Sequence, residues 1–219
     1  MHKSLLSTLA ISCIILFSSS LVAGGLGIAF TFGFGTTDYD WYEADANNVG
    51  INFVYDSNVA KRSLFNYRLT ASIEDFKHEY EFDEYYDPYI FNFGYSDSHA
   101  GRRFVTDHAF GFGIVKSSVV RLWMGPNIRF GFVVTGNNSG YTVGAGLTAL
   151  GLNFNMGRVF TLALEVGYLY NTDQYSDSID EHYYINSDIY ESIDSGSSKM
   201  FVVKLFILFR INDTYDDIF

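Results

Sequence analysis

Thiols, basic residues and long apolar runs are scarce in this chain of 219 residues. Its one cysteine, Cys13, falls in an N-terminal segment that we expect to be removed, so the mature chain could form neither a disulfide nor a cysteine metal site. Lys and Arg number 14 against 25 Asp and Glu. The formal net charge of −11 argues against nucleic acid as a partner, because phosphate binding needs a basic face. Beyond residue 23 no segment approaches 18 uninterrupted apolar residues.

Residues 1–23 show the features of a secretory signal peptide in the usual order. Lys3 supplies the positive charge, residues 5–17 are mostly apolar, and residues 18–23 form a small-residue exit. We expect cleavage after Ala23 or Gly24. An uncleaved anchor is the alternative, because the apolar stretch is near the minimum length of a spanning helix.

Aromatic side chains are abundant, at 18% of the chain, although the mean hydropathy is only +0.07. This combination suggests that apolar and polar residues alternate finely. In residues 26–35, with the sequence LGIAFTFGFG, large apolar residues alternate with small ones. A strand of a soluble sandwich carries polar or charged residues on its outer face. Large side chains toward lipid and small ones toward a crowded lumen explain the asymmetry seen here.

Eight segments alternate in this way: 26–35, 49–55, 65–74, 107–114, 121–132, 143–154, 160–168 and 201–210. The sixth slips register near Ala149, as a β-bulge would cause. The cleanest faces have the length of about 9–11 residues needed to cross a bilayer, and eight strands make the smallest barrel of this kind. We therefore predict an all-β fold, an eight-stranded antiparallel transmembrane β-barrel with meander topology over residues 24–211. Residues 212–219 are predicted to be a short periplasmic tail, and a soluble β-sandwich is the competing fold.

The connections between these segments differ in length and charge, which predicts the orientation. Long connections cover residues 36–46, 79–102 and 171–198, with a shorter one at 135–140, and short ones cover 56–63, 116–118 and 155–158. Residues 36–46, 79–100 and 171–198 hold 17 of the 25 acids and no Lys or Arg. Outer-membrane barrels have short periplasmic turns and longer surface loops, so both termini are predicted to be periplasmic.

The chain resembles the small outer-membrane barrels of the OmpA, OmpX and OmpW type. The resemblance is carried by residues 144–170, where a Gly-rich strand, an Asn-rich turn and a strand ending in Glu-x-Gly-Tyr follow one another. The last strand looks like a signal for the barrel-assembly machinery through Lys204, Phe209 and Ile211, although Phe206 stands where glycine is usual. The resemblance implies a bacterial outer-membrane location, with lipids and the assembly machinery as partners, and implies a function only loosely.

No catalytic, cofactor or metal site is predicted. His78, His99 and His182 lie at or near surface loops, and no two histidines have metal-ligand spacing along the chain. Ser96 to His99 contain the residue types of a hydrolase triad, but adjacent loop residues rarely converge as one. His108 is predicted on the outward face near the outer rim, where barrel deacylases keep a catalytic His, but the His-x-Ser motif of those enzymes is absent.

Inward parity places a set of charged residues in the lumen: Arg68, Glu74, Asp107, Arg121, Arg129, Glu165, Lys204 and Arg210. An eight-stranded barrel is only wide enough for its own side chains, and buried charges must pair. A network that plugs the lumen is the first interpretation, with Glu165 paired to an arginine such as Arg121 or Arg129. A narrow conduction path is the second, and the OmpW resemblance adds a pocket for a small apolar molecule.

Aromatic residues stud the acidic loops and are candidates for surface interaction: Tyr80, Phe82, Tyr85, Tyr86, Tyr183, Tyr184 and Tyr190. Alternation continues through residues 79–83, so strands could project beyond the membrane and pair with a foreign strand. The acids could capture divalent cations or an extracellular protein, or serve only solubility. Two functions follow from the sequence: a non-enzymatic surface protein for membrane structure and adhesion, and a minor channel or carrier.

Overall fold

The computed structural model describes residues 24–39, 43–57, 64–81, 96–136, 138–157, 159–181 and 191–211. The predicted signal peptide at 1–23 and tail at 212–219 lie outside these ranges, as do six of the seven aromatic loop candidates. Tyr80 is the exception, because its backbone belongs to a strand. Within the described part of the chain, no helix is long and apolar enough to cross a membrane.

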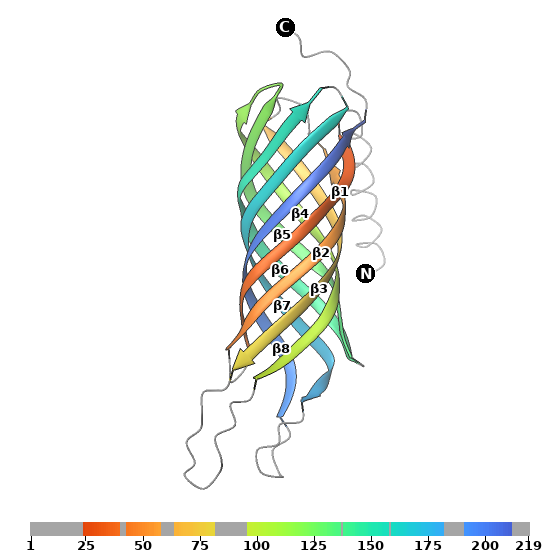
Figure 1. The fold of residues 1–219 in the computed structure, drawn as a ribbon, viewed down its shortest axis with the longest axis vertical. Coiled ribbons are helices and arrows are strands. Elements are labelled where there is room, and N and C mark those ends of the chain that lie inside the picture. Colours follow the sequence, from red (N-terminus) through yellow and green to blue (C-terminus); the bar gives the residue numbers. More distant parts are fainter. Residues whose placement is uncertain are drawn as a thin grey trace, which may run out of the picture.

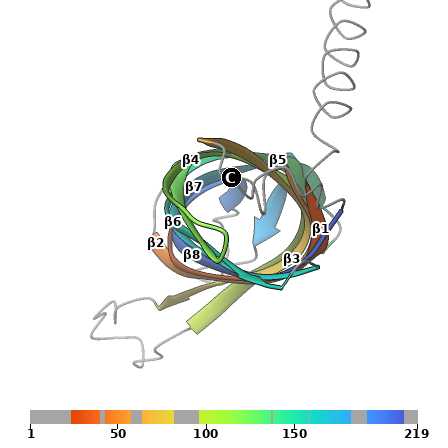
Figure 2. The ribbon, with the colours of Figure 1, turned by 90° about the horizontal axis from the view of Figure 1, so that it is seen from above.

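Eight strands form one closed antiparallel barrel in which each strand pairs with its neighbours in sequence and β1 closes on β8 (Figures 1 and 2). The strands are β1 Gly25–Asp38, β2 Glu43–Asp56, β3 Phe65–Glu81, β4 Ser96–Lys116, β5 Val120–Thr135, β6 Asn138–Met156, β7 Phe160–Glu181 and β8 Glu191–Arg210. This confirms the predicted fold class and meander topology. Ile211 N–H donates to the carbonyl oxygen of Gly24 at 2.8 Å, so the two ends of the barrel chain meet at one rim.

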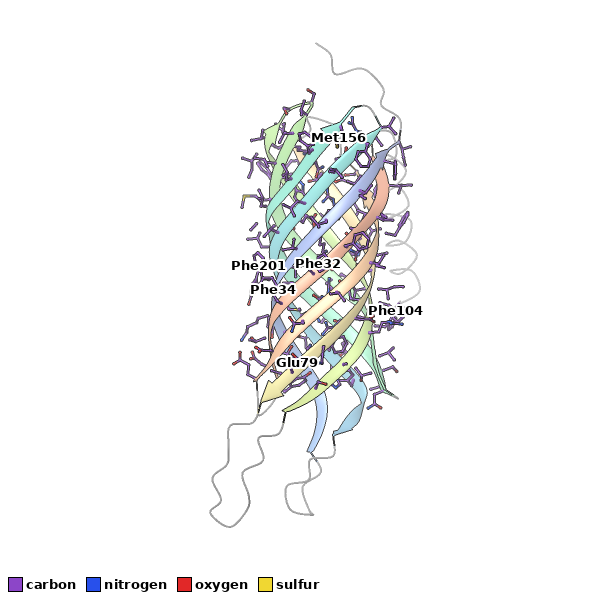
Figure 3. All side chains as sticks on the ribbon, in the orientation of Figure 1. Phe32, Phe34, Glu79, Phe104, Met156 and Phe201 are labelled. Atoms are coloured by element: carbon purple, nitrogen blue, oxygen red, sulfur yellow. The ribbon has the colours of Figure 1, made fainter. Side chains whose placement is uncertain are left out.

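The alternating sequence places large apolar side chains on the outside and polar or small ones inside. Along β1 the burial pattern alternates strictly from Gly25 to Phe34. Figure 3 shows Phe32, Phe34 and Phe201 on this outer surface. The outward apolar residues, which we call the apolar belt, include Ile28, Phe30, Phe32, Phe34, Ile51, Phe53, Phe65, Ile73, Phe104, Phe112, Phe130, Phe132, Leu205 and Phe209. A surface this apolar is suited to lipid rather than to water.

The strands extend beyond the belt at the rim away from the chain ends, which corrects the predicted loop boundaries. β3 continues to Glu81, β4 starts at Ser96, β7 continues to Glu181 and β8 starts at Glu191 (Figure 1). The outward face of β1 to β4 and β8 carries charged residues in this extension, which we call the charged ring although it covers only these strands: Asp38, Glu43, Asp45, Asp75, Lys77, Glu79, Arg102 and Lys199. On β3 and β8, the predicted strands stop where the next outward residues, Asp75 and Lys199, are charged. The backbone ladders continue because the inward residues still pack together.

Irregularities in the ladders of the described residues occur at four places. The β6–β7 register shifts between Thr148 and Leu150, as the parity change near Ala149 predicts. Three further shifts, after Gly113 on β4, after Trp123 on β5 and between Gln174 and Ile179 on β7, were not predicted. Trp123 is fully buried, and a Cβ on Gly151 would lie 2.2 Å from its ring, so the indole needs a glycine opposite it.

Candidate functional site

The lumen is filled by paired charges, beginning near the rim where the chain ends meet. Arg68 Nε and Nη2 donate to Asp56 Oδ2 at 2.9 and 2.5 Å, and Nη1 donates to Glu165 Oε1 at 2.8 Å. The guanidinium also lies 4.4 Å from the Phe206 ring centre. All of these groups are buried. One cation is therefore held by two carboxylates and an aromatic face, which compensates its desolvation.

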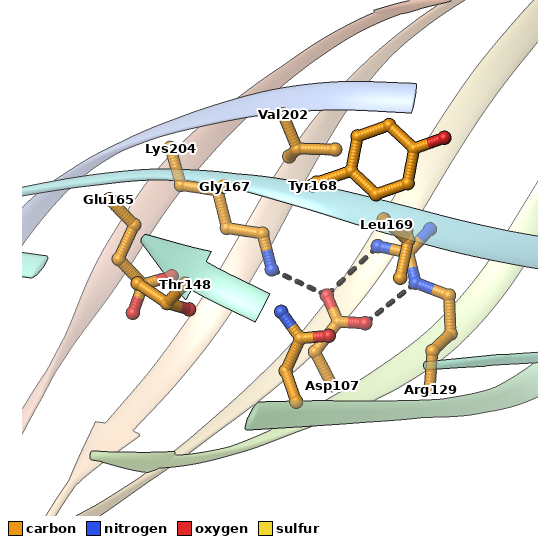
Figure 4. Close-up of a pocket in the computed structure, with 10 residues that line it drawn as sticks. Asp107, Arg129, Thr148, Glu165, Gly167, Tyr168, Leu169, Val202 and Lys204 are labelled. Atoms are coloured by element: carbon orange, nitrogen blue, oxygen red, sulfur yellow. Dashed lines mark hydrogen bonds and ion pairs between the residues drawn. The ribbon is translucent and has the colours of Figure 1, made fainter. Parts of the chain in front are cut away.

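A second cluster crosses the middle of the barrel. Arg129 donates to Glu74 at 2.7 and 2.8 Å and to Asp107 at 2.6 and 2.9 Å. Lys204 Nζ also donates to Asp107, at 2.6 Å (Figure 4). Asn48 Nδ2 donates to Glu74 Oε2 at 3.0 Å. Residues of β2, β3, β4, β5 and β8 thus contribute to one network. In it, the cations Arg129 and Lys204 face the anions Glu74 and Asp107.

A third cluster was not predicted from the sequence. Arg103 donates to Asp173, with Nε 3.0 Å from Oδ2, and its guanidinium stacks 4.0 Å from the Phe76 ring centre. Arg103 and Asp173 are buried in the lumen. Arg103 lies on the same face of β4 as the predicted lumen residue Asp107. Asp173 lies on the same face of β7 as the predicted lumen residue Glu165. Extending the alternation past the assumed strand ends would have found them.

The structure distributes the eight predicted lumen residues unequally. Six of them belong to the first two clusters, in which the partner of Glu165 is Arg68 rather than Arg121 or Arg129. Arg121 is buried on β5. Arg210 is half-buried at the rim, where its Nη2 donates to the carbonyl oxygen of Gly157. Arg210 therefore lies outside the central network because β8 ends there.

Little open space remains between the clusters. The cavity beside Asp107, Arg129, Glu165 and Lys204 offers about 20 Å³ to the centres of water molecules (Figure 4). That is room for about one water. Larger hollows of about 750 and 520 Å³ include belt residues such as Phe104, Phe132 and Phe112 in their walls. Their place in the belt suits acyl chains better than a lumenal substrate.

At the far rim, two histidines lie side by side in an aromatic cluster. His78 on β3 is directly opposite His99 on β4, with ring centres 6.0 Å apart. The Tyr39 hydroxyl lies 2.5 Å from His78 Nδ1, and the Tyr175 hydroxyl lies 3.3 Å from His99 Nε2. Phe76 packs beneath, 4.9 Å from the His78 ring. Chain spacing could not reveal this pair, because the β3–β4 register brings residues 78 and 99 together.

Burial lowers the pKa of His78 well below its usual range, and the positive charge of Arg103 lowers it further. This side chain lies beyond the apolar belt, between the exposed ring residues Lys77 and Glu79. His78 is thus expected to be neutral at neutral pH. Among the described residues, no three His, Cys, Asp or Glu side chains gather as a metal-ligand set.

His108 lies elsewhere than predicted. Its partners in the ladders are Leu69 and Ile128, so it is near the middle of the strands rather than at the outer rim. Its Nδ1 lies 2.7 Å from the Tyr67 hydroxyl. The difference arises because β4 begins at Ser96, well before the start predicted from the sequence.

Two hairpins project past their neighbours at the same rim. The β4–β5 ladder begins at Arg102 and Val134, whereas β4 itself begins at Ser96. The β6–β7 ladder ends at Gly140 and Tyr175, whereas β7 continues to Glu181. Within the described residues, residues 96–101 of β4 have ladder partners on β3 only, and residues 179–181 of β7 have ladder partners on β8 only. They flank the shorter β5–β6 hairpin.

Comparisons with known proteins identify a fold. No protein-family model matches the chain, and no curated protein matches it. The chain is similar to the outer membrane protein OprG from Pseudomonas aeruginosa, with a TM-score of 0.50 and 7% identity over 87% of this chain and 96% of that chain. Neisserial surface protein A matches over 84% of this chain and 97% of that chain, with a TM-score of 0.42 and 12% identity. The attachment invasion locus protein Ail of Yersinia pestis matches over 87% and 99%, with a TM-score of 0.34 and 14% identity. The likeness to OprG confirms the resemblance to small outer-membrane barrels at the level of fold.

Proposed function

We propose that this chain is an integral outer-membrane protein without enzymatic activity, whose sealed barrel carries a surface-interaction site on its extracellular extension. The apolar belt supports membrane insertion, since it presents aromatic and aliphatic side chains around the barrel. The short turns and both termini face the periplasm in this proposal. The last strand, β8, is the segment offered to the barrel-assembly machinery.

The observation that carries the interaction proposal is the pair of projecting hairpins. The ends of β4 and β7 that lack a second neighbour present backbone N–H and C=O groups, on which an extended segment of another protein can add as a strand. The hairpins lead into the acidic segments that contain Tyr85, Tyr86, Tyr183 and Tyr184. Backbone pairing would supply affinity, and the Tyr-rich, acidic segments would supply selectivity for a basic partner or for divalent cations.

A paired deletion tests this function. We would replace residues 79–98 and 176–193 with short turns, which removes the acidic segments and shortens the unpaired ends of β4 and β7, and measure binding of the reconstituted barrel to host cells and matrix proteins. The variant should keep the heat-modifiable gel migration of a folded barrel but lose binding, and wild-type binding should weaken with salt because exposed charges are screened. Undiminished binding by the folded deletion variant would refute the proposal.

A narrow channel is the second candidate, favoured by buried polar atoms that need water. Oδ1 of Asn52, both amide atoms of Asn66 and Oδ1 of Asn127 have no hydrogen-bond partner within the described part of the protein. Planar-bilayer recording of the wild-type barrel separates the two functions. The paired charge clusters predict no reproducible openings, whereas regular single-channel steps would favour the channel.

A further inference from the structure

The His78–His99 pair has the dimensions of a shared metal site. A metal lies about 2.0–2.1 Å from a ligating imidazole nitrogen. Because the ring centre lies about 1 Å further on, two imidazoles on one ion have centres separated by about 5 Å in tetrahedral geometry and at most about 6.4 Å. The observed separation of 6.0 Å falls inside this range, before any movement of the side chains.

The environment of His78 matches that of a ligand imidazole. Its Nδ1 is held by the Tyr39 hydroxyl, and its Nε2 is buried without a hydrogen-bond partner in the described structure. His78 itself is only 1% exposed. A ligating histidine usually donates its other ring N–H to an oxygen, which fixes the ring orientation. Tyr39 can accept that hydrogen bond, leaving the Nε2 lone pair for an ion.

His99 on the neighbouring strand β4 and Tyr175 on β7 complete the donor set. The Tyr175 hydroxyl is 3.3 Å from His99 Nε2, so oxygen and nitrogen donors lie together beside the pair. The nearest fixed cation is Arg103, and its charge is balanced by Asp173. Two imidazoles with phenol or water oxygens suit borderline divalent ions better than Mg²⁺ or Ca²⁺, which take all-oxygen sites.

We propose that His78 and His99 bind one Zn²⁺ or Cu²⁺ ion inside the outer mouth of the barrel. This site is distinct from the acidic segments of the proposed function and does not depend on it. An ion there would link β3 to β4 and draw in the hydroxyls of Tyr39, which follows β1, and of Tyr175 on β7. Through Tyr39 and Tyr175 it would tie the β3–β4 hairpin to other parts of the barrel.

The test uses full-length mature barrel in detergent, purified without a histidine tag. Calorimetric titration with Zn²⁺ should show one saturable site, and Cu²⁺ electron paramagnetic resonance should show two coupled nitrogens. His78→Ala and His99→Ala should each weaken binding at least tenfold. His108→Ala is the matched control, because this histidine lies on the outer face near mid-strand, and it should leave binding unchanged.

Three results would overturn the site: no saturable Zn²⁺ or Cu²⁺ binding, fewer than two nitrogens on Cu²⁺, or undiminished binding after both histidines are removed. In the last case Ca²⁺ should compete with Zn²⁺ for the same ligands, which would point to carboxylates on the outer segments. The resonance measurement uses the wild-type protein, so it decides the question even if a variant fails to fold.

Discussion

Arg102 and Arg103 are neighbours on β4 and lie in opposite regions of the molecule. The Arg102 side chain is 55% exposed in the charged ring and pairs with Asp75, while Arg103 is completely buried in the lumen and pairs with Asp173. The next residue, Phe104, is 44% exposed in the apolar belt. Burial in this barrel therefore follows the parity of the strand and not the polarity of the residue.

The two kinds of ion pair should differ in energy for the same reason. In the ring, water screens the charges and either partner can be solvated alone, so an exposed pair contributes about 0–1 kcal/mol. In the lumen, a charge that loses its partner stays buried, which costs about 3–5 kcal/mol. The lumen clusters thus join strands that are far apart in sequence, such as β3 with β7 and β4 with β8.

The largest effect is expected at the central cluster. Arg129→Met should destabilise the barrel by about 3–5 kcal/mol, because Glu74 loses its ion-pair partner and Asp107 keeps only Lys204. Arg102→Met, the matched control in the ring, should change stability by about 0–1 kcal/mol. Denaturant unfolding from lipid vesicles measures both. Equal effects in the two variants would show that the lumen is as well hydrated as the ring.

Parity is also what made most of the fold predictable. Alternation from residue 26 onward identified the strands, their outward faces and the bulge near Ala149. The extension past the belt was missed because outward residues such as Asp75 and Lys77 are polar there, so the contrast between the two faces disappears. Strand ends that depend on inward packing leave no such contrast in the sequence.

The clusters were only partly predictable because pairing depends on register and on distance across the lumen. Parity places Glu165 inside the barrel, but its partner Arg68 comes from β3, on the other side of the lumen. The His78–His99 pair likewise depends on the β3–β4 register. The alternation in a single sequence predicts whether a side chain faces the lumen or the lipid, but it does not predict which residue that side chain contacts.

A charge placed in the belt should have the next largest effect. Leu205, 49% exposed and midway between the outward residues Phe201 and Phe209 of β8, lies between Phe30 and Leu164 in the ladders. Leu205→Arg should cost about 2–4 kcal/mol at the bilayer midplane, whereas Ser197→Arg, on the same face of β8 beside the ring, should cost about 0–1 kcal/mol. Folding yield in vesicles is the measurement. Similar yields for both variants would mean that the belt does not face lipid.

The smallest of the three effects on stability is expected at Glu165. Its substitution by Gln removes the negative charge but leaves Arg68 a hydrogen-bond partner. Glu165→Gln keeps the size and a hydrogen-bond acceptor for Arg68, and Arg68 retains two bonds to Asp56. The loss of stability should therefore be about 1.5–3 kcal/mol, the contribution of a charge-assisted hydrogen bond, and less than for Arg129→Met.

A double-mutant cycle measures the coupling between the two carboxylates, from the unfolding of Glu165→Gln, Asp56→Asn and the double variant in vesicles. Because both carboxylates neutralise one guanidinium, the double variant should lose more than the sum of the single losses. Strict additivity would mean that Arg68 does not couple them and that water, rather than the second carboxylate, compensates each loss.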